Sequence, residues 1–208
     1  LGDWATPEGI DQTDPRSVDL VNNCFVAVCY QTMAKIAQTL GKPNDQKLYE
    51  SKNEQLRTLI HKTFYDSKEA SYGTGTQIDL VYPMLAGVTP ESQLSNLLNT
   101  LYKNTAERFR SHLATGLVGI PIITEWCIKN QQVNFMYQML KKRDYPSYSY
   151  MIDNGATTTW EHWNGERSHI HNCYNGIGTW FYQALAGIMP DEAHPGYKHV
   201  RISPQLAK

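Results

Sequence analysis

The sequence predicts an all-α domain, and three observations support that fold class. Apolar residues recur at helical spacing in one segment of the chain after another. The apolar–polar alternation that is typical of a β-strand is confined to the last residues. No heptad pattern persists and no period of about 34 or 40 residues recurs, which argues against a coiled coil and against a helical repeat protein. With 208 residues, the chain is long enough for one domain with a substantial core.

The first two predicted helices are amphipathic. The apolar face of the first follows the i, i+3, i+4, i+7 rule and consists of Val21, Cys24, Phe25 and Val28. Gly41 and Pro43 end this helix. A second helix follows Asn44 and Asp45, and its apolar residues are Leu56, Leu59, Ile60 and Phe64.

The next two helices have clear boundaries. Residues 77–86 form a shorter third helix, whose expected buried side chains are Leu80, Val81, Met84 and Leu85. Thr89 can cap a fourth helix, because Pro90 then takes its first position and Glu91 lies in its first turn. The apolar face of the fourth helix consists of Leu94, Leu97, Leu98 and Leu101.

Three more helices and two long loops complete the predicted domain. Residues 121–129 and 131–141 are expected to form helices in antiparallel contact. The last helix, at about 175–187, carries on one side Ile177, Phe181, Ala184 and Leu185. Between the helices lie a glycine-containing loop at 66–76 and a longer one at 143–174, which is rich in aromatic residues, His, Asn and Thr. A loop of this length inside a compact domain is often functional.

The C-terminal tail changes character. From Gly196 to Ile202 apolar and polar residues alternate, and Pro204 follows. This pattern predicts a β-strand that enters a further module. We therefore expect residues 1–195 to belong to the helical domain and residues 196–208 to begin a C-terminal β module.

Charge and cysteine content exclude several classes of protein. The 19 basic and 20 acidic side chains give a net charge of −1, so nothing favours electrostatic binding of nucleic acid or of an anionic membrane. No apolar run is long enough to span a bilayer. The chain starts at Leu1 without an initiator Met or a signal segment, and we expect it to come from a longer polypeptide. We interpret the cysteines as ordinary buried thiols without disulfide or zinc spacing; they are Cys24, Cys29, Cys127 and Cys173.

The segment from Gly155 to His171 carries most of the chemistry that the sequence indicates. Trp160 and Trp163 flank one carboxylate, Glu161. Aromatic faces cover the C–H surfaces of a pyranose, and a carboxylate that is partly removed from water can orient or deprotonate a water molecule. The alternatives are an ion pair of Glu161 with a nearby cation, either Arg167 or Lys198, and a simply solvated side chain.

The other polar candidates are weaker. His162, His169 and His171 lack the helical i, i+4 pair and the third ligand of a metal site, so we predict none there. A neutral histidine can instead bind a sugar hydroxyl or a backbone group. Asp3 next to Trp4 combines a hydroxyl acceptor with an aromatic platform. Three further acids lack the glycine and the terminal glutamate of a calcium loop and are expected to cap helices or face solvent; they are Asp11, Asp14 and Asp19. No phosphate-binding glycine loop is present, and we expect no cofactor.

Several segments together resemble the α-L-rhamnosidases of glycoside hydrolase family 78. Gly155–Trp163 resembles the GATTxWExW signature of that family, and Leu1–Trp4 resembles its GDW element. Thr115–Pro121 is similar to the TGFxGTP turn, Tyr145–Tyr150 to the YPSWLY segment, and Pro195–Lys198 to the PGYK exit.

Further residues of the same ordered set extend the resemblance over nearly the whole chain. Ser168 and His171 fit the SxNH element, and the helix motif GxWLY is matched by Gly178, Trp180 and Tyr182. The chain departs from the family pattern near the expected pocket at His162, Tyr148, Ile170 and Asn175. These departures affect the identity of the sugar more than the class of reaction.

The resemblance implies a fold and a reaction. The fold is an (α/α)6 barrel, of which this chain is the C-terminal half, followed by a β-sandwich module. The reaction is the inverting hydrolysis of terminal α-L-rhamnosides without a metal or cofactor. Glu161 is the implied general base, and Trp160 and Trp163 shape its pocket. His171 hydrogen-bonds the rhamnose ring, while Asp3 with Trp4 belongs to the sugar subsite.

The resemblance also implies what the chain lacks. The general acid of the family lies in a DERxGWxGD stretch upstream of the GDW element, so the implied partner is the remainder of the same catalytic domain, and the segment alone is expected to be inactive. The implied substrate is a rhamnose-containing glycan or glycoside. By analogy alone, the parent is expected to be extracellular or periplasmic.

Three other interpretations remain open from the sequence. The chain can belong to another (α/α)6 enzyme, either an exo-glycosidase for a different sugar or a polysaccharide lyase that uses Arg167 and His169. It can be a non-catalytic carbohydrate-binding helical segment. A helical protein-interaction scaffold is the third, but that interpretation lacks repeats and gives the aromatic loop no role.

Overall fold

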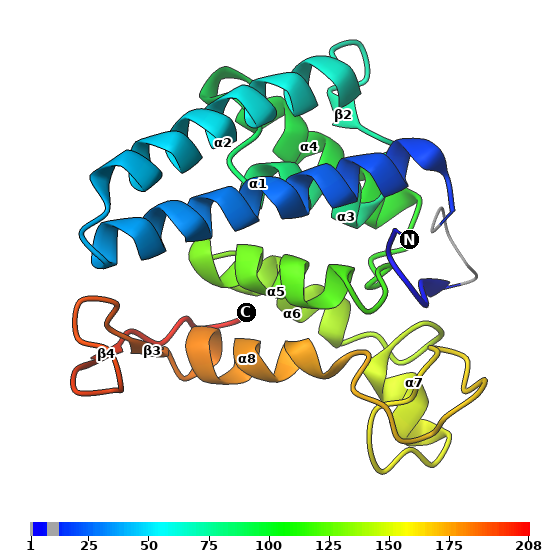
Figure 1. The fold of residues 1–208 in the computed structure, drawn as a ribbon. Coiled ribbons are helices and arrows are strands. Elements are labelled where there is room, and N and C mark those ends of the chain that lie inside the picture. The colour runs from blue at the N-terminus through cyan, green and yellow to red at the C-terminus, as the bar shows by residue number, and fades with distance from the viewer. Residues whose placement is uncertain (1, 8–12) are drawn as a thin grey trace. The chain divides into compact units, whose positions relative to one another are not determined.

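The computed structural model describes residues 2–7 and 13–208 as a mainly helical chain (Figure 1). The chain forms two compact units. The first comprises residues 1–3 and 11–104, and the second comprises residues 4–10 and 105–208. No helix in the described part of the chain is long and apolar enough to cross a bilayer.

The first unit is built on two long helices, α1 (Pro15–Thr39) and α2 (Pro43–Phe64), which pack side by side along their length (Figure 1). Asp14 caps α1 by accepting a 2.9 Å hydrogen bond from the Arg16 N–H, as expected for this acid; Asp11 lies outside the described residues. Gly41 has φ +65°, a left-handed conformation that glycine adopts without strain, so the chain reverses there and Pro43 starts α2.

The buried side of α1 differs in part from the predicted apolar face. Val21 and Cys24 are buried, but Phe25 is 60% exposed. Small side chains replace it on the buried side, which consists of Ser17, Leu20, Val21, Cys24, Ala27, Ala34 and Ala37. On α2 only Ile60 is buried, and Leu59 is 59% exposed. Phe25 and Leu59 fit the predicted apolar periodicity, but both side chains are largely exposed.

A short hairpin and two more helices complete the first unit. The predicted loop at 66–76 contains an antiparallel pair of strands, β1 (Tyr65–Asp66) and β2 (Ser71–Tyr72). Helix α3 spans Gln77–Leu85, as predicted to within one residue. Helix α4 spans Glu91–Glu107 and begins next to the predicted start at Pro90.

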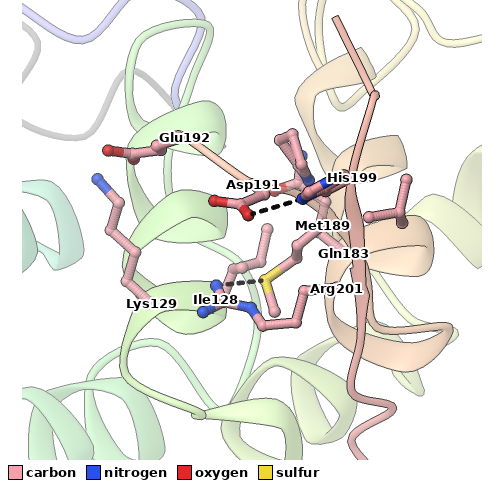
Figure 2. Close-up of a pocket in the computed structure, with 10 residues that line it drawn as sticks. Ile128, Lys129, Gln183, Met189, Asp191, Glu192, His199 and Arg201 are labelled. Carbon is pink, nitrogen blue, oxygen red and sulfur yellow. Dashed lines mark hydrogen bonds and ion pairs between the residues drawn. The ribbon is translucent and has the colours of Figure 1, made fainter. Parts of the chain in front are cut away.

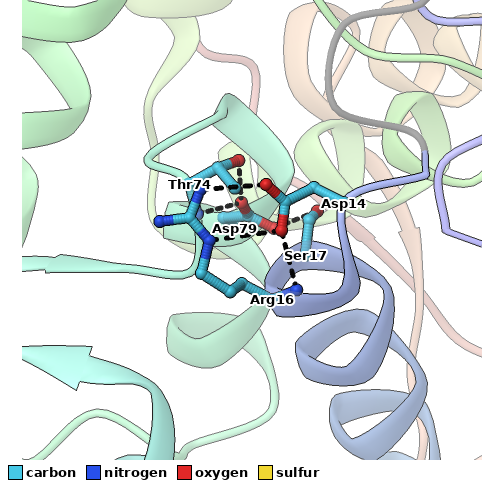
Figure 3. Close-up of polar contacts among 5 residues, drawn as sticks. All are labelled: Asp14, Arg16, Ser17, Thr74 and Asp79. Atoms are coloured by element: carbon cyan, nitrogen blue, oxygen red, sulfur yellow. Dashed lines mark hydrogen bonds and ion pairs between the residues drawn. The ribbon is translucent and has the colours of Figure 1, made fainter.

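A buried carboxylate, Asp79, joins α1 to α3 (Figure 3). Its Oδ1 accepts the Ser17 hydroxyl at 2.6 Å, and its Oδ2 accepts the Thr74 N–H and the Thr74 hydroxyl, both at 2.8 Å. Burial raises the pKa of Asp79, although these hydrogen bonds act in the opposite direction. The site is a polar cross-link in the core of the first unit.

The second unit contains α5 (Gly119–Lys129) and α6 (Val133–Leu140), which pack against each other as predicted. Within the predicted loop at 143–174 the structure adds a short helix, α7 (Tyr148–Asp153), which sequence reasoning missed. The core of this unit includes the fully buried residues Ile120, Ile123, Met136, Trp163, Tyr174 and Trp180.

The predicted last helix is composite. It starts as a 3₁₀ turn at Asn175–Ile177, continues as α8 (Gly178–Trp180) and ends in a π-helical turn at Phe181–Leu185. Ile177 and Ala184 are buried, whereas half of Phe181 is exposed.

The tail forms the predicted strand, β4 (Val200–Ile202), which pairs antiparallel with β3 (Ile188–Pro190). The strand is shorter than the predicted alternation, and its partner lies before residue 195. The assignment of residues 196–208 to a separate β module stays a prediction.

All four cysteines are free, as predicted. Three of them are buried, namely Cys24, Cys127 and Cys173. Cys29 is exposed, so its predicted burial is wrong.

Candidate active site

The loop that carries Glu161 is closed by hydrogen bonds between its two arms. The Glu161 N–H donates to the Ser168 carbonyl at 2.9 Å, and the His171 N–H donates to the Thr159 carbonyl at 3.0 Å. In return, the Ser168 N–H donates to Oε2 of Glu161 at 3.3 Å. The backbone of the loop therefore orients the carboxylate of Glu161 as well as its main chain.

The two tryptophans beside Glu161 anchor this loop. Trp163 is 1% exposed, donates its indole N–H to the Thr115 carbonyl at 2.9 Å and stacks on Tyr174 with ring centroids 4.1 Å apart. Trp160 is also buried and stacks on His169, with centroids 4.7 Å apart and an interplanar angle of 22°. Both indoles are packed against protein, so they fix the backbone on either side of Glu161. Their direct contact with a sugar stays a prediction.

The carboxylate of Glu161 is only 17% exposed and lies beside a cation. Nη1 of Arg167 is 3.5 Å from Oε1 of Glu161. The guanidinium carbon of the same Arg167 lies 5.3 Å from the centroid of the Trp4 ring, a cation–π contact. Arg167 has φ +63°, which is uncommon for a residue with a side chain and marks a tight turn in the loop. The structure thus brings Glu161 and Trp4 together through Arg167.

Trp4 is positioned by the predicted glycine turn at 115–121. The Leu117 N–H donates to the Trp4 carbonyl at 2.7 Å. Gly116 permits this approach, because a Cβ at that position would lie 1.8 Å from the Trp4 carbonyl oxygen. The next residue, Ala5, accepts a 2.7 Å hydrogen bond from the Tyr174 hydroxyl. The ring of Trp4 stays partly exposed, while its backbone is fixed.

The predicted histidine of the site, His171, is partly exposed and has a defined tautomer. Its Nδ1 accepts the Cys173 N–H at 3.0 Å, so a neutral ring carries its proton on Nε2 and offers a donor there. His162 contacts the Trp4 ring edge-on, with centroids 5.9 Å apart. Among the described residues, the buried Nε2 of His162 has no hydrogen-bond partner.

Asp3 is buried and belongs to the first unit, whereas the other predicted site residues belong to the second. Its place in a sugar subsite stays a prediction. Sequence reasoning considered Arg167 as an alternative partner of Glu161 and as a residue of a polysaccharide lyase, but not as a contact of Trp4. The signal that was available is the cation six residues after the glutamate, but the turn at Arg167 that directs it toward Trp4 has no sequence signature.

The loop presents one oriented carboxylate, that of Glu161, and its ion-pair partner Arg167 also contacts the ring of Trp4. Among the described residues, the one group of three potential metal ligands lies outside this loop. The loop offers a proton acceptor at Glu161 and a donor at His171 Nε2, and Trp4, which Arg167 contacts, adds a partly exposed aromatic surface. This set can bind a small hydroxylated molecule and take a proton from water.

Comparison with known proteins identifies similar chains. Residues 1–185 match the bacterial alpha-L-rhamnosidase 6 hairpin glycosidase domain. The chain is 31% identical to an alpha-L-rhamnosidase from Alteromonas sp. (strain LOR) and 30% identical to one from Formosa agariphila, with 99% and 98% of this chain aligned. It spans only 24% and 23% of the lengths of these relatives.

Solved structures show the same likeness. The alpha-L-rhamnosidase of Streptomyces avermitilis complexed with L-rhamnose aligns with a TM-score of 0.87 at 26% identity, over 99% of this chain and 20% of that one. The alpha-L-rhamnosidase from Dictyoglumus thermophilum aligns with a TM-score of 0.86 at 28% identity, over 98% of this chain and 23% of that one.

Proposed function

Because the chain belongs to the six-hairpin glycosidase domain family of bacterial α-L-rhamnosidases, we propose that it forms part of an enzyme that hydrolyses terminal α-L-rhamnosides with inversion. Since the chain spans about a quarter of the length of its relatives, the activity belongs to a longer polypeptide. The substrate is a rhamnose-capped glycan or a rhamnosylated small glycoside.

One observation carries this proposal: the Glu161 carboxylate has partners on both of its oxygens, and one of them, Arg167, also contacts the Trp4 ring. The Ser168 N–H donates a hydrogen bond to Oε2, and the Arg167 guanidinium forms an ion pair with Oε1. A general base must present a lone pair in one direction, and two fixed partners provide that orientation without the cost of ordering the side chain during the reaction.

In the proposed reaction, Glu161 takes a proton from a water molecule, and the water oxygen attacks the anomeric carbon of rhamnose. A second carboxylic acid, supplied by another part of the polypeptide, protonates the departing glycosidic oxygen on the opposite face. Inverting enzymes place the two carboxyl groups about 6.5–9.5 Å apart, which leaves room for the water.

The proposed sugar contacts come from this loop and from Trp4. The exposed part of the Trp4 ring packs on the C–H face of the pyranose. The Nε2–H of His171 donates to a ring hydroxyl. Trp160 and Trp163 support these groups by holding the loop.

The reaction class is tested with the parent enzyme on p-nitrophenyl α-L-rhamnopyranoside, with p-nitrophenyl α-D-mannopyranoside as the control substrate. Proton NMR during early turnover is expected to show β-L-rhamnose as the first product. First-formed α-L-rhamnose would contradict inversion. An unsaturated uronide from a pectic substrate would favour a lyase, and binding of rhamnose without turnover would favour a carbohydrate-binding module.

A further inference from the structure

The connection between β3 and β4 brings two histidines and one carboxylate together, away from the loop of Glu161 in the sequence. Nδ1 of His194 lies 2.8 Å from Oδ2 of Asp191, and Nδ1 of His199 lies 4.0 Å from the same oxygen. The two imidazole rings are in contact, with centroids 3.8 Å apart and an interplanar angle of 35°. The three ligand atoms all lie within 4.8 Å of one another.

The backbone of this connection brings the three residues of the cluster close together. Asp191 and His199 directly follow and precede the paired residues Pro190 and Val200 of the two strands. The Asp191 N–H also donates to the His199 carbonyl at 3.4 Å, and the His194 N–H donates to the Asp191 carbonyl at 3.0 Å. The hairpin therefore presents all three side chains from one short closed loop.

We propose that Asp191, His194 and His199 form a binding site for a divalent transition-metal ion of the zinc class. Imidazole nitrogen and carboxylate oxygen are preferred zinc ligands, and three of them leave the remaining coordination positions to water. Zinc–nitrogen and zinc–oxygen bonds are about 2.0–2.2 Å long, so small side-chain rotations close the cluster around an ion.

The hydrogen bonds of Asp191 also suit metal binding. The hydrogen bond from His194, and next the N–H of Ala193, hold the pKa of Asp191 below its ordinary value, so its carboxylate is ionised at neutral pH. The Ala193 N–H donates to Oδ1 at 3.0 Å and leaves Oδ2 facing the histidines. When an ion replaces the proton between His194 and Asp191, a neutral His194 keeps its proton on Nε2.

The cluster lies at the edge of a pocket of about 890 Å³ (Figure 2). Figure 2 shows Asp191 and His199 facing each other, with Lys129 of α5 and Arg201 of β4 also lining the pocket. Arg201 places Nη2 4.0 Å from the Met189 sulfur. The bound ion would link the two ends of the connection and stabilise the C-terminal hairpin.

The test is metal binding by the parent enzyme, produced without a histidine tag and stripped with EDTA. Zinc is titrated by calorimetry, and cobalt(II) is titrated by visible absorption, which reports its ligand field. We expect one ion at this site. Since outer-shell partners alone change metal affinity by about 10–100-fold, H194A and H199A are expected to lower the affinity by at least about 100-fold. D191N is expected to weaken binding as well.

The matched control is E192Q, which removes one negative charge from the same loop and keeps the three ligands. It is expected to bind zinc as the wild type does. X-ray absorption at the zinc edge of the wild type needs no variant and is expected to show two imidazoles in the first shell. The proposal fails if the wild type binds no zinc, if the histidine variants bind as tightly, or if the first shell contains only oxygen.

Discussion

Arg167 and Glu161 form the ion pair at the centre of the candidate site, with 3.5 Å between Nη1 and Oε1. The Arg167 side chain is 59% exposed, so the pair contributes at most about 1 kcal/mol to the free energy of unfolding. Its contribution is positional, because the same guanidinium also lies on the ring of Trp4.

Replacement of Arg167 is therefore expected to affect catalysis more than stability. In the parent enzyme, R167Q is predicted to lower kcat by about 10–100-fold, since misplacement of a reacting group by about 1 Å has effects of this size. R167K keeps the charge but lacks the planar fork, and it is predicted to restore only part of the rate. A rise in KM alone, with kcat unchanged, would contradict the positioning role.

A matched control for this prediction is R143Q. Arg143 forms a comparable exposed ion pair with Asp153. Asp153 is the last residue of α7, and Arg143 precedes this helix in the chain. Thermal unfolding and steady-state kinetics of both variants are the measurements. R143Q is expected to leave kcat unchanged.

Two glycines of the second unit are predicted to respond in opposite directions to substitution by alanine. G116A forces a Cβ against the Trp4 carbonyl and is expected to lower the free energy of unfolding by about 1–3 kcal/mol. Gly178 begins α8, and a Cβ there would meet no neighbouring atom within 4 Å. G178A is therefore expected to raise the free energy of unfolding by about 0.5–1 kcal/mol. Urea unfolding of the two variants measures both changes. A free energy of unfolding of G116A equal to that of the wild type would contradict the close approach of Gly116 to the Trp4 carbonyl.

Asp79 is expected to make the stability of the first unit depend on pH. Because burial raises its pKa above the ordinary value of 3.8, the folded chain keeps the proton to higher pH than the unfolded chain. The stabilisation is complete below 3.8 and is lost as the pH rises through the folded pKa. The difference in unfolding free energy between wild type and D79N should therefore fall with rising pH above this value.

In D79N the amide oxygen can accept from Thr74, and the Ser17 hydroxyl can rotate to accept from the amide nitrogen. The variant therefore keeps the cross-link of Figure 3 without a titrating group. Urea unfolding at several pH values provides the comparison. A difference that increases with pH would contradict the raised pKa.

The helix boundaries were predictable because they depend on local chemistry. Gly41 and Pro43 end one helix and start the next, and no distant contact is needed for either effect. Periodicity also showed which residues share a face. Periodicity could not show how wide the buried side of α1 is: Phe25 fits the apolar spacing but is exposed, and the small residues Ala27 and Ala34 are buried instead.

The candidate site was predictable where it rested on residue types and was missed where it rested on backbone turns. Glu161 and Trp4 were found from their chemistry. The left-handed conformation of Arg167, which links them, carries no pattern of its own. In the same way, Asp191 and His199 are eight residues apart and meet only because β3 and β4 pair.

The central claim is that Glu161 activates the attacking water, and the most direct measurement compares E161Q with E166Q in the parent enzyme. Glu166 is an exposed glutamate of the same loop, so its variant makes the same chemical change without touching the carboxylate at position 161. On p-nitrophenyl α-L-rhamnopyranoside, E161Q is predicted to lose about 10²–10⁴-fold in kcat, and E166Q is predicted to match the wild type. An E161Q enzyme within a few-fold of wild-type kcat would contradict the account.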